Sequence, residues 1–234
     1  MSPDKTLQPK TARLRLRVSM AAESSIRKGH PWLFADSIRD QNRPGKTGET
    51  AVIYDRQNKF LALGLFDADS PIRVRLLIAG KPQDLNSAWW QRRLSDALQR
   101  REGLFDDQTT AYRCINGESD GWPALVLDRY GSNLVLKLYS AIWLPRIQEI
   151  ASLLVKELGP ERVVLRLSRN IQQVAGSTFS LVDGQVLSGP ALKSANVSFD
   201  RSFPLASSEP TFIKPIVGCS RWRMCLAKID PMTP

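Results

Sequence analysis

The stretch that most constrains the fold lies between residues 113 and 139, where two apolar segments flank a short turn. It opens with a polar, glycine-rich turn at residues 116–121 and continues into the apolar residues 124–127. After a second turn at residues 131–133, leucine occupies every other position of residues 134–139. Because a period of two is typical of a strand with one buried face, this stretch predicts a β-hairpin preceded by an acidic turn.

The order of residues within this stretch is also similar to that of a known family. The likeness is carried by Arg113, Gly117, Glu118, Asp120, Gly121, Pro123, Leu125, Val126 and the run from Asp128 to Gly131. In this order they resemble the central region of the RlmI-like methyltransferases, which modify C5 of cytosine in large-subunit ribosomal RNA. The resemblance covers roughly residues 12 to 200. It implies an N-terminal PUA domain and a small central α/β domain, and in the family a C-terminal domain that binds S-adenosylmethionine.

Composition favours a globular chain with a polyanionic partner. The 234 residues are 42% hydrophobic and 24% charged, enough for one large or two small domains. Lysine and arginine total 33 against 23 acidic residues, giving a net charge of +10. Nucleic acid is therefore the leading partner, although a soluble protein that is simply basic remains the alternative. Because no apolar run reaches the ~18 residues of a membrane span or resembles a secretory signal, we expect a cytoplasmic protein without membrane contact.

Cysteine and histidine are too few and too scattered for a zinc site or a thiol–imidazole pair. The cysteines are Cys114, Cys219 and Cys225, and His30 is the single histidine. Their spacing lacks the short ligand intervals of structural zinc sites. We therefore predict reduced thiols in a reducing compartment and no metal site.

Residues 12–82 predict a PUA-like RNA-binding domain, built as a small closed β-barrel. In residues 13–18, arginine alternates with leucine or valine, so one strand face is apolar and the other cationic. Further strands are predicted at residues 49–54, 59–66 and 72–78, and in the last of these Arg73 and Arg75 repeat the outward pattern. Such a face suits RNA phosphates. The alternative is an ordinary solvated surface strand, which has the same pattern.

The segment after the first strand supplies a second candidate RNA contact. Residues 24–29 predict a helical turn that is capped by serine and ended by glycine. The sequence around it, RKGHPWLF, resembles the family's PUA signature. Trp32 and Phe34 fit barrel core better than base stacking. The predicted RNA-binding residues are Arg13, Arg15, Arg17, Arg27, Lys28, His30, Arg73 and Arg75.

Residues 86–200 predict the family's central α/β domain, so that the fold class as a whole is α+β. A helix from residue 86 or 87 to about 105 would bury the stripe that contains Trp90, Leu94 and Phe105. A second helix begins at Pro145, and a strand follows at residues 162–168. Residues 201–234 hold five prolines and no period, and they predict an irregular tail in place of the S-adenosylmethionine domain.

No catalytic, cofactor-binding or metal-binding residue is predicted. A doubly wound S-adenosylmethionine site needs a glycine-rich turn between strand and helix, and the sequence contains no such unit. Cytosine-C5 chemistry needs a thiolate nucleophile, and none of the cysteines lies in a motif that we associate with one. For Glu118, Asp120 and Asp128, structural roles in turns and hairpins are favoured over acid–base roles.

These observations lead to one main expectation and two alternatives. Only 34 residues follow position 200, fewer than the roughly 100 to 150 of a typical domain. We expect the RNA-binding portion of an RlmI-like methyltransferase, truncated by a frameshift or a split gene and inactive alone, with ribosomal RNA as its partner. The alternatives are a stand-alone PUA-type RNA-binding protein without catalysis and a non-functional truncation product.

Overall fold

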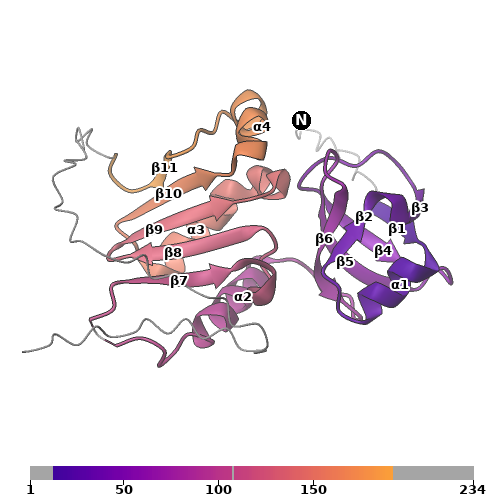
Figure 1. The fold of residues 1–234 in the computed structure, drawn as a ribbon, viewed down its shortest axis with the longest axis horizontal. Coiled ribbons are helices and arrows are strands. Elements are labelled where there is room, and N and C mark those ends of the chain that lie inside the picture. The colour runs from indigo at the N-terminus through magenta and orange to yellow at the C-terminus, as the bar shows by residue number, and fades with distance from the viewer. Residues whose placement is uncertain (1–12, 107, 192–234) are drawn as a thin grey trace, which may run out of the picture. The chain divides into compact units, whose positions relative to one another are not determined.

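The computed structural model describes residues 13–106 and 108–191, and the statements below concern these residues. They form two mixed sheets with flanking helices, which confirms the predicted α+β class (Figure 1). The strand order of the six-stranded sheet is β2-β6-β5-β4-β1-β3, and that of the five-stranded sheet is β11-β10-β9-β8-β7. The predicted tail, residues 201–234, lies outside the described residues.

The first sheet contains the four predicted strands, near residues 13–18, 49–54, 59–66 and 72–78, and two short strands that the sequence patterns did not predict, at residues 32–34 and 38–41. Its members are β1 (Leu14–Val18), β2 (Trp32–Phe34), β3 (Ile38–Gln41), β4 (Thr50–Tyr54), β5 (Phe60–Phe66) and β6 (Ile72–Ala79). Between the described residues no ladder joins the edge strands β2 and β3, so the sheet is a curled half-barrel rather than the closed barrel that we expected.

The helix on this sheet, α1 (Met20–Arg27), begins earlier than predicted. Ser19, directly after β1, is its N-cap, and the Ser19 hydroxyl accepts a hydrogen bond from the backbone N–H of Ala22 at 3.3 Å. The predicted cap at Ser24 was wrong because the alanines after Met20 are good helix formers and extend the helix back to Ser19. Gly29, with φ of 90°, follows the C-cap Lys28 as expected.

The second sheet contains the predicted hairpin, the predicted strand near residues 162–168, and two strands that the sequence patterns did not reveal, at residues 111–116 and 186–188. Its strands are β7 (Ala111–Asn116), β8 (Leu125–Tyr130), β9 (Asn133–Leu138), β10 (Arg162–Leu167) and β11 (Val186–Ser188). The remaining helices are α2 (Ser87–Gln99), α3 (Ile147–Leu158) and α4 (Arg169–Phe179), with 3-10 turns η1 (Ala35–Ser37), η2 (Gly117–Asp120) and η3 (Ala141–Arg146). Helix α2 ends at Gln99, so Phe105, which is 39% exposed, is not part of its buried stripe.

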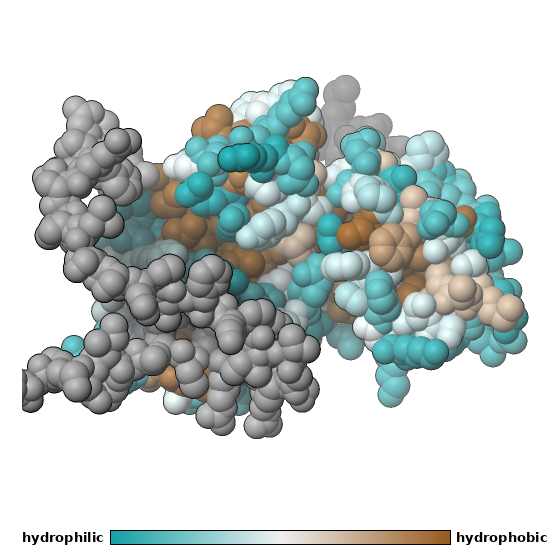
Figure 2. Space-filling model, viewed as in Figure 1, coloured by the Kyte–Doolittle hydropathy of each residue, from teal (hydrophilic) through white to brown (hydrophobic). Residues whose placement is uncertain are grey.

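Burial alternates along β9 as its sequence predicts. Leu134, Leu136 and Leu138 are fully buried, while Lys137 and Tyr139 lie on the opposite face. The leucine face belongs to a large apolar cluster whose centre is Trp90, Trp122 and Trp143, with ring centroids 5.2 to 5.8 Å apart. Where it is visible, the other face of the sheet shows both hydrophobic and hydrophilic residues (Figure 2).

The same apolar cluster includes side chains of the first sheet. Leu65, Leu77 and Ile78 pack in it together with Trp90 of α2. A second cluster fills the concave side of the half-barrel, where Leu14, Leu16 and Val18 meet Ile26 of α1. The first sheet therefore contributes apolar residues to two cores, and the domain boundary between residues 82 and 86 stays a prediction.

A candidate nucleic-acid interface

The outer face of β1, together with the residue before it, carries three arginines. Arg13, Arg15 and Arg17 are exposed on it, opposite the buried Leu14, Leu16 and Val18. Among the described residues none of the three arginines forms an ion pair, and the Arg15 guanidinium lies 4.8 Å from the ring centroid of Tyr54. This arrangement leaves three guanidinium groups available to an external anion.

The end of α1 adds positive charge that is partly neutralised. Arg27 is 54% exposed and donates to Glu23 Oε1 at 3.2 Å and Asp55 Oδ2 at 3.0 Å. Backbone N–H groups of Lys59 and Gln57 also donate to Asp55, and the Lys59 bond is the main cause that lowers the pKa of this carboxyl. Lys28 is exposed and forms no ion pair with a described residue. Of Arg27 and Lys28, Lys28 is therefore the more available to an RNA phosphate.

His30, Trp32 and Phe34 form an aromatic group on the edge strand β2 and the turn before it. The imidazole lies 5.8 Å from Trp32 and 6.1 Å from Phe34, measured between ring centroids. Phe34 is 41% exposed and Trp32 is half-buried, whereas Leu33 between them is buried. The prediction that Trp32 and Phe34 are core was wrong, because the alternation of β2 turns Leu33 inward.

The two arginines of β6 do not stand free as predicted. Arg73 Nη1 donates to the carbonyl oxygens of Asp67, at 3.0 Å, and Ala68. The Arg75 side chain is only 11% exposed, and its Nη1 donates to Glu118 Oε1 at 3.3 Å. Burial lowers the pKa of Arg75, against the opposing influence of Glu118. Whether these two residues contact RNA stays a prediction, but their expected exposure is corrected.

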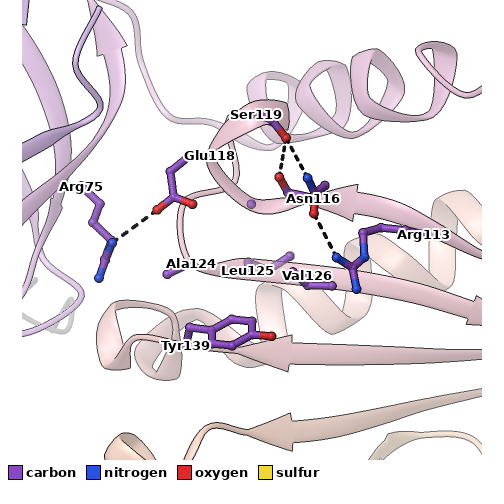
Figure 3. A pocket seen from close by; sticks show the side chains of 10 residues that line it. Arg75, Arg113, Asn116, Glu118, Ser119, Ala124, Leu125, Val126 and Tyr139 are labelled. Carbon is purple, nitrogen blue, oxygen red and sulfur yellow. Dashed lines mark hydrogen bonds and ion pairs between the residues drawn. The ribbon is translucent and has the colours of Figure 1, made fainter. Parts of the chain in front are cut away.

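Beside Arg75 lies a pocket of about 470 Å³ (Figure 3). Its lining consists of Arg75, Arg113, Asn116, Gly117, Glu118, Ser119, Ala124, Leu125, Val126 and Tyr139. Glu118 Oε1 accepts from Trp32 Nε1 at 3.0 Å and from Arg75, so this one carboxylate oxygen connects β2 and β6 with η2. The sequence did not predict the pocket; the only signal was the position of Glu118 within the family-like motif.

Polar contacts order the β7 side of the pocket. Arg113 binds both carboxylate oxygens of Asp128, at 2.8 and 3.3 Å, and its Nη1 donates to Asn116 Oδ1 at 3.0 Å. The hydrogen bond to Asp128 is the main cause that raises the pKa of Arg113. Asn116 in turn donates from Nδ2 to Ser119 Oγ at 3.2 Å. The pocket wall is therefore a connected network before any ligand arrives.

The other two candidate reactive groups in this region are tied into the fold. Asp120 is 4% exposed and accepts from Arg100, Arg101 and the backbone N–H of Asn116. Cys114 is buried, and burial raises the pKa of its thiol. A raised pKa disfavours the thiolate that nucleophilic chemistry requires.

Residues 13–106 and 108–191 offer neither a candidate metal site nor a candidate membrane span. No three His, Cys, Asp or Glu side chains of this region gather as metal ligands would. None of its helices combines the length and the apolar character that crossing a bilayer requires.

Comparison with known proteins agrees with this geometry. A PUA-like domain model matches residues 16–78, which run from Leu16 in β1 to Ile78 in β6 and include α1 and the strands β2 to β5. A "Ribosomal RNA large subunit methyltransferase" of Deinococcus radiodurans is 52% identical over 182 residues, 76% of this chain and 44% of the relative. This chain is homologous to RlmI-like ribosomal RNA large subunit methyltransferases. A Klebsiella pneumoniae "Ribosomal RNA large subunit methyltransferase I" is 38% identical over 128 residues, 54% of this chain and 32% of the relative.

Solved structures support the same fold. A protein from Streptococcus mutans, described as a SAM-dependent methyltransferase, superposes with a TM-score of 0.62 at 18% identity, over 76% of this chain and 44% of its own. A methyltransferase complexed with SAH gives a TM-score of 0.59 at 19% identity, over 67% and 41%. These structures support the fold, whereas the resemblance to the RlmI-like family and to the PUA domain is confirmed by the sequence relatives and the PUA-like match. The chain spans less than half the length of the relatives and structures that it matches.

Proposed function

We propose that this chain is the RNA-binding portion of an RlmI-like, cytoplasmic ribosomal RNA methyltransferase, and that it does not transfer a methyl group by itself. The observation that carries the proposal is the exposed arginine face of β1, at the start of the region that matches a PUA-like domain. Alternate residues on a strand lie roughly 6.6 Å apart, so the three guanidinium groups form a line about 13 Å long. A line of cations of this length, without ion-pair partners among the described residues, suits a run of backbone phosphates.

Replacing this line of charge tests the proposal. In the full chain, Arg13, Arg15 and Arg17 are changed together to glutamine, and binding to a ribosomal RNA fragment is titrated at several salt concentrations. For every phosphate that the variant no longer neutralises, the slope of log K against log salt should fall by about 0.7 to 0.9. The slope of the triple variant should therefore be shallower than that of wild type by about 2.

A second triple variant controls for net charge. Lys81, Arg92 and Lys156 are exposed residues outside β1, and their replacement by glutamine removes the same three charges. This control should retain a near wild-type slope, since long-range attraction alone is screened beyond about 10 Å at 0.1 M salt. Equal reductions in both variants would show that bulk charge, not the β1 face, holds RNA.

The PUA-like match by itself also fits a second function, a stand-alone RNA-binding protein without catalysis. The two functions differ in the RNA that is preferred. A portion of a ribosomal RNA methyltransferase should favour large-subunit ribosomal RNA over other structured RNA, and a general binder should not. Calorimetry with S-adenosylmethionine and transfer of its labelled methyl group to that RNA check the expected inactivity. Tight cofactor binding or label transfer by this chain would overturn it.

A further inference from the structure

The pocket beside Arg75 combines a flat aromatic wall, an apolar floor and a carboxylate. The Tyr139 ring and the Glu118 carboxylate lie on opposite sides of the backbone of residues 124–126 (Figure 3). We propose that this pocket takes one unstacked RNA base that carries an exocyclic amino group. The inference rests on the proposed RNA binding. It adds a site that recognises a base, in addition to the arginines that would bind phosphates.

Tyr139 provides the stacking surface. It is 43% exposed, just beyond the end of β9, and the pocket lining continues along residues 124–126. The Val126 side chain lies on the same sheet face as Lys137, whereas the Leu125 side chain is fully buried in the core on the other face. Lys137 Nζ lies over the Tyr139 ring, 5.0 Å from its centroid, so a cation accompanies the aromatic ring although Lys137 does not itself line the pocket. An aromatic ring with an adjacent cation is the usual arrangement for holding a splayed base of single-stranded RNA.

Glu118 supplies the base-specific contact. Its Oε1 is already engaged by Trp32 and Arg75, which fixes the direction of the carboxylate. Its Oε2 accepts no hydrogen bond from a described residue, and the side chain is 29% exposed. A fixed carboxylate oxygen accepts from the amino group of cytosine, adenine or guanine, whereas uracil presents a carbonyl oxygen at the corresponding position.

Two further features indicate a built site rather than an incidental hollow. Ala124, in the pocket wall, has φ of 57°, a left-handed conformation that costs a residue other than glycine about 1 kcal/mol and tends to cluster at ligand sites. Arg75 Nε is buried without a hydrogen-bond partner among the described residues. The volume of about 470 Å³ lies within the range of small-ligand pockets, roughly 300 to 1,000 Å³, and accommodates a single base.

A pair of tyrosines on one sheet face offers a matched experiment. Tyr130, 54% exposed at the end of β8, does not line the pocket, while Tyr139 does. With the full chain, binding is measured to a stem–loop RNA with an unpaired loop and to its fully paired counterpart. Tyr139→Ala should weaken stem–loop binding roughly tenfold, the change expected when one base no longer has its aromatic stacking partner. Duplex binding should not change, and Tyr130→Ala should bind both RNAs like wild type.

Base preference is tested by the conservative variant Glu118→Gln. Stem–loops that differ only by cytosine or uracil at one loop position are compared, with that position scanned along the loop. Wild type should favour cytosine at one position by several-fold, and Glu118→Gln should reduce that preference to near unity, because its amide can donate as well as accept. Tyr139→Phe should retain both affinity and preference.

The outcomes separate this inference from the function on which it rests. If wild type binds neither RNA, the proposed RNA binding itself fails. If wild type binds RNA in a salt-dependent manner but Tyr139→Ala matches Tyr130→Ala, the pocket is not a base site. Equal weakening for stem–loop and duplex would likewise overturn the inference, since a duplex presents no unstacked base.

Discussion

Strands β1 and β6 carry the same sequence pattern, arginine alternating with aliphatic residues, and the structure uses the two sets of arginines in opposite ways. On β1, Arg15 and Arg17 are exposed and without ion-pair partners among the described residues. On β6, Arg73 donates to backbone carbonyls, and Arg75 is largely covered and paired with Glu118. Alternation therefore predicts which face a side chain takes, but not whether that face is open to solvent.

The neighbours of each strand explain the difference. Arg75 lies directly across from Trp32 on β2, and its guanidinium is 5.9 Å from the indole centroid. At Gly64 of β5 any side chain would clash with the Arg75 carbonyl, so this part of the sheet is tightly packed. Beside β1, the neighbouring strand β4 presents Tyr54, which the Arg15 guanidinium covers. The β1 arginines thus extend into solvent, while Arg75 is enclosed.

Replacing Asp120 should have the largest effect on stability, because this buried carboxylate pairs with two arginines in the folded protein. Asp120→Asn should destabilise the protein by about 3 kcal/mol, because it leaves the guanidinium of Arg101, 15% exposed, and the N–H of Asn116 without their charged acceptor. Asp128→Asn breaks the pair with Arg113, which is 43% exposed, and should cost at most about 1 kcal/mol. Urea unfolding followed by tryptophan fluorescence measures both. Equal costs would contradict the distinction between buried and exposed pairs.

Matched substitutions of one arginine on β6 and one on β1 compare directly how much each contributes to stability. Arg75→Met should lower the free energy of unfolding by about 1 to 2 kcal/mol, since Glu118 loses a largely covered partner. Arg17→Met, on the open face, should change it by less than about 0.5 kcal/mol. Adding Glu118→Gln to Arg75→Met should recover part of the stability, because no uncompensated carboxylate then remains. Chemical denaturation of the single and double variants measures these differences. Additive effects of the two substitutions would show that the Arg75–Glu118 pair carries no coupling.

Local sequence patterns predicted the elements that depend on residues close together in the sequence. The hairpin of β8 and β9, the alternation of β1 and the end of α3 at Gly159 follow from periods and turn residues that are visible in the sequence. Strand β7 was missed because a bulge between Arg113 and Ile115 interrupts its alternation and buries both Cys114 and Ile115. Helix α4 was missed because its stripe of buried residues is short, Ile171 and Ala175.

The candidate site was predictable only where it depends on one strand. The alternation of β1 predicted which face carries its arginines, and the structure shows that this face is exposed, whereas the same pattern on β6 gave the wrong expectation for Arg75. The pocket depends on the contact between Trp32 and Glu118, which are 86 residues apart, and no single-sequence pattern indicates such a pair. The error at Trp32 and Phe34 has a local cause: large aromatic residues favour burial on average, yet here the smaller Leu33 takes the inward position.

Arg27 is exposed like the β1 arginines but paired with a carboxylate like Arg75. The pH dependence of stability tests this pairing, and it is the smallest effect that we expect. Asp55, its partner, has a pKa lowered by the hydrogen bond from the Lys59 N–H, to which the Gln57 N–H and Arg27 add. A carboxyl whose folded pKa is lowered stabilises the fold above its unfolded pKa of about 3.9 and loses this contribution as pH falls through the folded value. The melting temperature of Asp55→Asn should therefore lie below that of wild type at neutral pH, and the gap should close below about pH 4. Asp69→Asn, in an exposed loop position, should show a smaller gap throughout. A gap for Asp55→Asn that stays constant down to low pH would mean that the carboxylate charge contributes nothing. Arg27 would then resemble the β1 arginines, which have no ion-pair partner among the described residues.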